Sequence, residues 1–218
     1  MKNDSKRPSA ARGFGLIELM VAMTIGLIML LAVSYFFLGS QQSSKSHDDS
    51  SRMQENARNA LDAMGRAIRQ AGYRSFADIG ITLPWTPITG TASTITVNFE
   101  AQDGGETDCT GAAVADGVKL QYSFSVVNGE LVCSNGTTTA VIAENVESLA
   151  LTYGVDANRD GVIESYATPA DFTQVAVVKV VLTMKGSNAN AATTGSGSAD
   201  GYLRQTYSAS YTLRNQAG

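Results

Sequence analysis

Residue types that build catalytic or metal centres are scarce in this 218-residue chain. It has one histidine, His47, one tryptophan, Trp85, and two cysteines. His47 lies in a polar stretch with no second histidine, so a metal cluster or a catalytic dyad built on it is not expected. The sequence also lacks a G-x-S-x-G nucleophile motif and a glycine-rich phosphate loop. We therefore predict that the protein is not an enzyme.

Charge is nearly absent from residues 15–38, where Glu18 is the only charged side chain. About 20 apolar residues suffice to cross a bilayer core, so this run is long enough for a transmembrane helix. A cleaved secretory signal has a shorter apolar core and a small-residue cleavage site, which argues for a membrane anchor instead. Four basic residues and one acid precede the run. This excess predicts a cytoplasmic N-terminus at the inner membrane and a periplasmic C-terminal region.

Glu18 needs an explanation, because a charged residue at the centre of a membrane helix costs at least about 2.5–3.5 kcal/mol. No lysine or arginine lies between Gly13 and Ser44 that could neutralise it. A cut between Gly13 and Phe14 would create a cationic α-amino group four residues before Glu18. That amine could belong to the same chain or to a neighbouring subunit.

The segment "RGFGLIELMVAMTIG" resembles the class III signal of type IV pilins and pseudopilins, apart from Gly15, where many relatives have Thr or Ser. The resemblance implies that prepilin peptidase cuts after Gly13 and methylates the Phe14 amine. It also implies that Glu18 pairs with this amine on an adjacent subunit. Removal of residues 1–13 leaves 12 basic and 19 acidic residues, a formal charge of −7. This balance argues against a nucleic-acid-binding surface.

A second, amphipathic helical pattern follows the apolar run. Small and apolar residues recur every three or four positions on one face, at Met53, Ala57, Ala60, Leu61, Met64, Ala67, Ile68 and Ala71. This spacing predicts a helix face that packs against a core, and Gly72 is a suitable C-cap. The pairs Asp48–Arg52 and Asp62–Arg66 have a spacing that favours helices. One helix could run from Phe14 to Ala71, with its continuity through the polar residues 40–51 left open.

Beyond Gly72 the pattern changes to short β-like runs with turn signals between them. These runs cover residues 93–99, 118–127, 129–133, 139–143, 147–155, 172–184 and 202–215. Asn128-Gly129 indicates a tight hairpin, and residues 185–200 read as a surface loop of small residues. The predicted class is α+β, a type IV pilin-like fold with a long N-terminal helix packed on an antiparallel sheet. The predicted regions are a leader at 1–13, a membrane or filament-core helix at 14–38, an amphipathic helix at 39–72 and a head at 73–218.

The head itself is similar to the PilW-like minor pilins. The resemblance is carried by "IRQAGY", "LVC", "VIAENVESLALTYGVDANRDGVIESY", "VAVVKVVLTM" and "YTLRN", in this order. It implies a low-abundance pilin that forms a complex with other minor pilins, primes assembly of the type IV pilus and sits at or near its tip. The implied partners are other minor pilins, the major pilin, prepilin peptidase and a large tip adhesin.

Two alternative functions remain open from the sequence. One is a type II secretion pseudopilin, which would share the helix and the processing. The other is an adhesin with a ligand-binding head, whose binding surface would lie in residues 76–107 or 185–200.

Cys109 and Cys133 both lie on the predicted periplasmic side of the membrane. Isolated cysteine pairs in an oxidising compartment usually join, so we expect a disulfide.

A calcium site is the one cofactor that the sequence suggests. "DANRDG" has the alternating oxygen ligands and the glycine of the first half of an EF-hand loop. The candidate ligands are Asp156, Asn158, Asp160, the Val162 carbonyl and Glu164. The twelfth position is Ala167 instead of the usual bidentate Glu, so binding would be weak. The alternative is an Asx-rich turn that forms without an ion.

The processing site is tested by the substitution Gly13→Val, which should leave the full-length precursor in the membrane because the larger side chain blocks cleavage. N-terminal sequencing of the wild-type chain should begin at methylated Phe14. A start elsewhere, such as after Ala32, would favour a secretory signal instead.

Overall fold

The computed structural model describes residues 15–74, 85–102, 106–189 and 200–214. The chain forms two compact units, residues 1–44 and 45–218. Helix α1, Leu16–Gln70, contributes residues to both units, and residues 40–51 are helical. The polar stretch therefore does not interrupt the helix. The proposed cleavage site at Gly13 and Phe14 lies outside the described residues.

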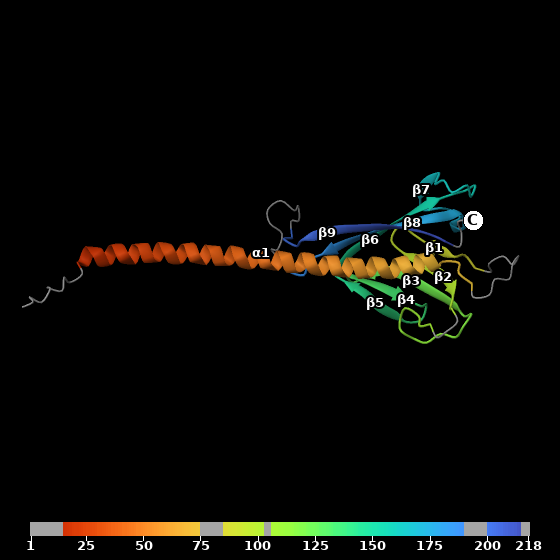
Figure 1. Ribbon diagram of the computed structural model, residues 1–218, viewed down its shortest axis with the longest axis horizontal. Coiled ribbons are helices and arrows are strands. Elements are labelled where there is room, and N and C mark those ends of the chain that lie inside the picture. Colours follow the sequence, from red (N-terminus) through yellow and green to blue (C-terminus); the bar gives the residue numbers. More distant parts are fainter. Residues whose placement is uncertain (1–14, 75–84, 103–105, 190–199, 215–218) are drawn as a thin grey trace, which may run out of the picture. The chain divides into compact units, whose positions relative to one another are not determined.

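In the described residues, nine strands form the β-structure of the second unit. Figure 1 shows how they are arranged. A five-stranded sheet has the order β1-β2-β3-β4-β5, with bounds Ile88–Gly90, Ile95–Glu100, Lys119–Val127, Glu130–Ser134 and Thr139–Glu144. A four-stranded sheet has the order β7-β6-β8-β9, with bounds Ser165–Ala167, Val146–Val155, Val175–Lys185 and Arg204–Thr212. All pairings are antiparallel, and a 3₁₀ helix, η1, spans Phe172–Gln174 before β8.

The strands divide between two sheets, where the sequence predicted one. Asn145, with φ 59°, turns the chain out of β5 and into β6. The backbone amide of its neighbour Val146 donates a hydrogen bond to the Gly129 carbonyl in the β3–β4 turn of the first sheet. The Asn145 carbonyl accepts one from the amide of Lys185 in the second sheet. Asparagine tolerates the left-handed conformation that this corner requires. The alternation of side chains marks each strand but carries no signal for this change of sheet.

All seven β-like runs contain a strand, and the strands β1 and β7 were missed. Each of these two has only three residues, which is too short for a period-two pattern. The hairpin between β3 and β4 turns at Asn128 and Gly129, with φ 53° and 83°. This conformation confirms the turn predicted from Asn-Gly. Residues 190–199 of the predicted surface loop and residues 76–84 and 103–105 of the proposed binding region lie outside the described residues.

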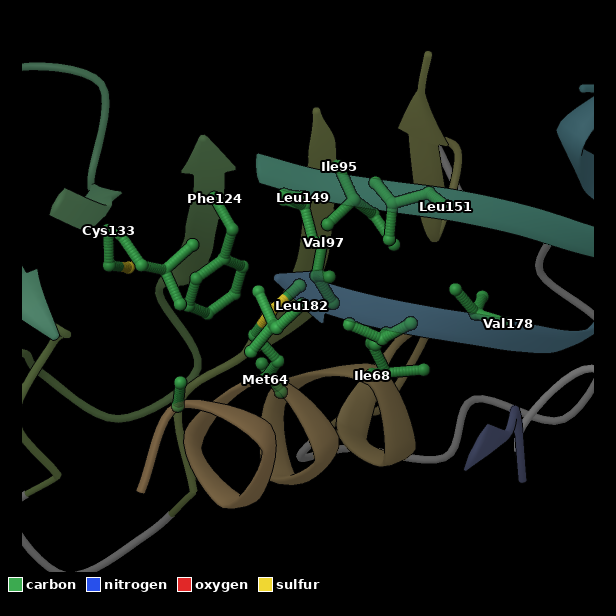
Figure 2. Packing of buried hydrophobic residues seen from close by; sticks show 14 of the residues in the cluster. Met64, Ile68, Ile95, Val97, Phe124, Cys133, Leu149, Leu151, Val178 and Leu182 are labelled. Carbon is green, nitrogen blue, oxygen red and sulfur yellow. The ribbon is translucent and has the colours of Figure 1, made fainter. Parts of the chain in front are cut away.

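The predicted apolar face of the helix is confirmed as part of the core. The buried helix residues are Asp49, Met53, Ala57, Ala60, Met64, Gly65, Ala67 and Ile68. All of them except Asp49 and Gly65 belong to one cluster with apolar side chains of both sheets (Figure 2). Met64 and Ile68 face residues such as Leu182 and Val178 of β8 in this view. Burial of each large apolar side chain stabilises the fold by about 1.5–3 kcal/mol. Among the ion pairs of the described residues, neither Asp48–Arg52 nor Asp62–Arg66 is present.

Helix and sheet approach closely where Gly65 faces Tyr211 of β9. A Cβ atom at position 65 would overlap the Tyr211 ring. The Tyr211 hydroxyl donates a hydrogen bond of 2.7 Å to the Leu61 carbonyl, one turn earlier on the helix. Arg69 is on the same helix as Gly65, and its guanidinium lies 5.5 Å from the centroid of the Tyr211 ring. The absent side chain of Gly65 thus makes room for an aromatic ring that binds the helix backbone.

The two cysteines form a disulfide, Cys109–Cys133, which confirms the predicted pairing. The neighbouring Asp108 is 8% exposed and accepts hydrogen bonds from Thr110, Ala112 and Asn135. The hydrogen bond from the Asn135 amide is the largest cause that lowers the pKa of Asp108 from its ordinary 3.8 to about 2. The disulfide and this carboxylate together attach the loop before β3 to the end of β4.

We expect Gly65→Ala to lower the free energy of unfolding by about 1–3 kcal/mol, because overpacking forces the Tyr211 ring or the helix to move. Thermal unfolding of the purified full-length chain in detergent measures the change. Gly39→Ala is the matched control, since a Cβ atom there meets nothing within 4 Å. Equal melting temperatures for both variants would contradict this close contact.

Asp108 should contribute to acid stability. Its pKa is about 2 in the folded state and has the ordinary value of 3.8 in the unfolded state. Its contribution to the free energy of unfolding is therefore complete above pH 3.8. The contribution is lost as the pH falls toward 2, because both states then bind the proton. We expect Asp108→Asn to lower the free energy of unfolding at pH 7 by on the order of 1 kcal/mol. The variant should also lose less stability than the wild type between pH 4 and 2. Denaturant unfolding across this range measures it, and parallel pH profiles for the two proteins would argue against it.

Candidate functional site

The first candidate site is the apolar N-terminal segment of α1. This helix is long and apolar enough to cross a membrane. Its large apolar residues from Leu16 to Leu38 are exposed, with Leu16 at 80%. The hydroxyls of Thr24 and Ser34 donate to the carbonyls of Val21 and Leu30 in the preceding turn. Their polar groups are therefore satisfied within the helix, as a lipid environment requires.

Glu18 lies in the first turn of this helix, where a negative charge is favoured by the helix dipole. Its backbone amide donates to the Gly15 carbonyl at 3.0 Å. No ion pair or side-chain hydrogen bond to the Glu18 carboxylate is found among the described residues. The carboxylate is therefore available to a cation from outside residues 15–214. The Phe14 amine, which we predicted as that cation, lies beyond the described part of the chain.

The second candidate site is the loop between β6 and β7. Carboxylate oxygens of Asp156, Asp160 and Glu164 all lie within 4.8 Å of one another. Sequence reasoning selected these three residues, and the fold brings them together. Asn158 donates to Asp160 at 3.1 Å, and the Val162 side chain is exposed.

The same loop is also stabilised by its own backbone. Asp156, 7% exposed, accepts from the amides of Asp160 and Gly161 at 3.2 and 2.9 Å. Glu164 accepts from the amide of Ala157 at 2.9 Å. These contacts form the Asx-rich turn that was the alternative to an ion site. The carboxylates can serve as calcium ligands or as turn acceptors, and calcium binding stays a prediction.

Sequence reasoning missed two polar features of the head. Asp49 is 1% exposed and accepts hydrogen bonds from Ser187 and from the backbone and side chain of Asn188. Its position continues the spacing of Met53 and Ala57 by one more turn, so it falls on the apolar face. That helical spacing was the signal that could have identified it, although its polar neighbours obscured the pattern.

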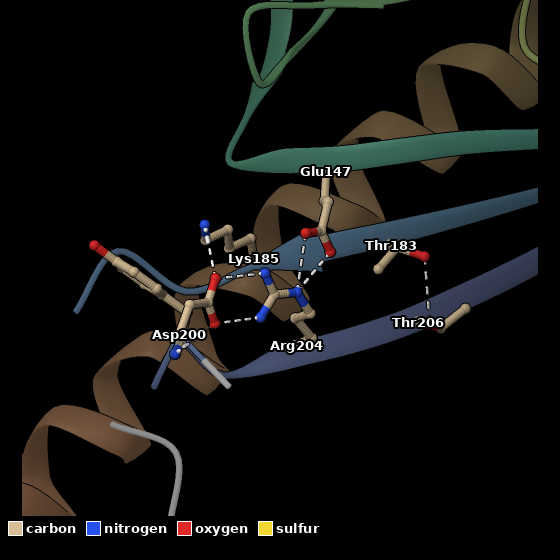
Figure 3. Close-up of polar contacts among 7 residues, drawn as sticks. Glu147, Thr183, Lys185, Asp200, Arg204 and Thr206 are labelled. Carbon is tan, nitrogen blue, oxygen red and sulfur yellow. Dashed lines mark hydrogen bonds and ion pairs between the residues drawn. The ribbon is translucent and has the colours of Figure 1, made fainter. Parts of the chain in front are cut away.

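The second missed feature is an ion-pair network centred on Arg204 (Figure 3). Arg204 contacts Glu147 at 2.8 Å and Asp200 at 2.7 Å, and Lys185 lies 3.3 Å from Asp200. The hydrogen bond from Arg204 lowers the pKa of Glu147 and is the largest cause of that shift. Asp200 and Arg204 are four residues apart, but Glu147 and Lys185 are distant from them in the sequence, and no spacing rule joins these two to the network. The network holds the ends of β6, β8 and β9 together.

Comparisons with known families match the N-terminal segment of the chain and the C-terminal part of its head. The prokaryotic N-terminal methylation motif matches residues 8–34, and type IV pilus-assembly protein W matches residues 124–215. The comparison with curated proteins gives no significant match.

Solved structures give matches at low sequence identity. A type IV-like pilin from Thermus thermophilus is 15% identical, with a TM-score of 0.51 over 76% of this chain and 99% of its own. This likeness concerns the fold. A structure of a complex of two type 2 secretion pseudopilins from Vibrio vulnificus is 14% identical, with a TM-score of 0.40 over 76% of this chain and 98% of the matched chain.

The methylation motif, the long helix and the antiparallel sheets together define a type IV pilin-like protein. Within this class, residues 124–215 match the family of type IV pilus-assembly protein W. The family resemblance seen in the sequence is thereby confirmed.

Calcium binding to the β6–β7 loop would raise the melting temperature of the protein, because a ligand of the folded state stabilises it. Extracellular calcium loops bind at roughly 0.1–1 mM. We expect a gain on the order of 1 kcal/mol at a few millimolar calcium. Asp160→Ala should abolish the rise, whereas Asp62→Ala, on the exposed helix face, should keep it. An unchanged melting curve in calcium, or an equal rise in magnesium, would leave the plain turn as the better account.

Proposed function

We propose that this protein is a minor pilin that primes assembly of the type IV pilus within a complex of minor pilins at or near the pilus tip. One observation carries the proposal. The same chain joins an N-terminal methylation motif at residues 8–34 to a type IV pilus-assembly protein W domain at residues 124–215. The first part suits processing and insertion into a pilin assembly, and the second matches a family named for assembly of the type IV pilus.

The chemistry of the N-terminal helix supports an assembly role. Its exposed apolar side chains can lie in lipid before assembly and against other apolar helices afterwards. Such a helix could slide along a like neighbour with little change in contact. Glu18 and an amine of the adjacent subunit would fix the register, since opposite charges attract strongly at low dielectric and an unpaired charge is penalised.

The proposed location follows from the same segment. A basic N-terminus remains in the cytoplasm, the helix anchors the chain in the inner membrane and the head folds in the periplasm. The disulfide Cys109–Cys133 is consistent with an oxidising compartment. The proposed partners are other minor pilins, the major pilin, prepilin peptidase and a tip adhesin, and the role is structural.

The assembly role is tested by Glu18→Ala, which should leave membrane insertion and cleavage intact. It should reduce surface pili and co-purified partner pilins by about tenfold, because the charge pair that sets the register is lost. Glu18→Gln should have the same effect as Glu18→Ala, because the side chain keeps its size but loses its charge. Thr24→Ala is the matched control, because its hydroxyl bonds only within its own helix in the described residues.

Pili are counted and partner pilins quantified at equal protein levels. Normal piliation and partner recovery in Glu18→Ala would contradict the assembly contact. Loss of type II secretion with unchanged pili on deletion of the protein would instead identify a pseudopilin.

A further inference from the structure

A polar cleft lies in the head where the two sheets meet at the β5–β6 turn. It consists of a hollow of about 710 Å³ and an adjoining one of about 320 Å³. The two hollows share Glu144, Asn145, Lys185, Gly186 and Ser187. Residues from β4, β5, β6 and β8 and from the turn between β3 and β4 thus surround one space, which we call the corner cleft.

The walls of the corner cleft are fixed by hydrogen bonds. Backbone bonds of 2.8 and 2.9 Å join Val146 to Gly129 and Lys185 to Asn145. On the helix side, the buried Asp49 holds Ser187, and a Cβ atom at Gly186 would approach the Asp49 Oδ2 atom to 2.6 Å. The cleft is therefore formed before any partner arrives, and little conformational entropy is lost on binding there.

Two carboxylates of like charge face each other at this cleft. Glu130 of β4 and Glu144 of β5 are partners in the strand register. Side chains at directly opposite positions have Cβ atoms about 4.5–5.5 Å apart, and like charges there are destabilising. Neither carboxylate has an ion pair or a side-chain hydrogen bond within the part of the chain that the structure describes. A cation placed between them would turn this repulsion into attraction.

The cations that line the cleft form no ion pair with Glu130 or Glu144 among the described residues. Lys185 contacts Asp200 at 3.3 Å and lies 4.2 Å from the centroid of the Tyr202 ring. Arg204 is not part of the lining, although it contacts the lining residue Glu147, and it is held by Glu147 and Asp200 (Figure 3). Arg52, which lines the smaller hollow, forms no ion pair with Glu144 among the described residues. The missing positive charge must therefore come from another molecule.

The chemistry of the lining selects the kind of molecule. Sites for small organic ligands are mostly apolar, whereas this lining is mainly polar and charged. The only group of three carboxylates near enough to share a metal ion, in the described ranges, is Asp156, Asp160 and Glu164. An open, polar and acidic surface suits a basic protein partner, and Arg offers a fork that can bind two carboxylates.

We propose that the corner cleft binds an Arg or Lys side chain of a neighbouring pilin-like subunit between Glu130 and Glu144. The inference rests on the proposed function, because it takes the neighbour to be another subunit of the assembly. It assigns to the head a contact that is separate from Glu18. The helix would set the register of the subunit, and the cleft would select which neighbour the head accepts.

The test uses the full-length chain in cells that assemble it. The variant Glu130→Gln/Glu144→Gln should reduce co-purified pilin-like subunits by about tenfold, because two charge-assisted contacts are lost. Its melting temperature should be unchanged or raised, since the mutual repulsion is removed as well. Asp48→Asn/Asp62→Asn removes the same charge on the exposed face of the helix and should leave subunit recovery at the wild-type level.

A cross-link identifies the bound residue. A photo-reactive amino acid at Asn128, which lines the cleft in the exposed β3–β4 turn, should label a peptide of a pilin-like subunit that contains Arg or Lys. Replacement of that basic residue by Glu should abolish recovery, and Glu144→Lys should restore it.

The outcomes separate the two proposals. Normal recovery with Glu130→Gln/Glu144→Gln, a fall in its melting temperature that accounts for the loss, or a label on a lipid or on a peptide without basic residues would overturn the inference alone. Recovery of no pilin-like subunit with the wild-type chain would contradict the proposed function, and the inference with it.

Discussion

The head depends on one face of α1 that carries small side chains. Ala57, Ala60 and Gly65 allow the sheets to approach the helix backbone, and Met64 and Ile68 fill the space between them. Tyr211 shows how close the approach is, since its ring occupies the position of the missing Gly65 side chain and its hydroxyl bonds the helix carbonyl of Leu61. Close packing of this kind makes the register of helix and sheet specific.

The helix serves two environments by changing its side chains while its backbone stays the same. From Leu16 to Leu38 its surface is mainly apolar, and the hydroxyls of Thr24 and Ser34 bond within the helix. From Met53 onward only one face is apolar, and the other carries charge. An α-helix satisfies its own backbone in lipid and in water, so a single element can join a membrane anchor to a water-exposed domain.

Charge has different roles along the molecule. Arg204 and Asp108 accept or donate several hydrogen bonds each and hold strand ends and a loop in place. Glu18, Glu130 and Glu144 have no such partners among the described residues. In the proposed assembly, unneutralised carboxylates at an apolar helix and at a preformed cleft are the groups that a neighbouring subunit can complement.

The sequence alone determined the elements whose pattern is local. The apolar run, the three-and-four spacing from Met53 to Ala71, the Asn128-Gly129 turn and seven of the nine strands could all be read from short stretches, as could the calcium-like order of Asp156 and Asp160. Tertiary structure alone decided the division into two sheets at Asn145, the burial of Asp49, the Arg204 network and the facing of Glu130 with Glu144. These features join residues distant in the chain, and side-chain periodicity specifies which face a residue occupies but not which strand or loop lies opposite.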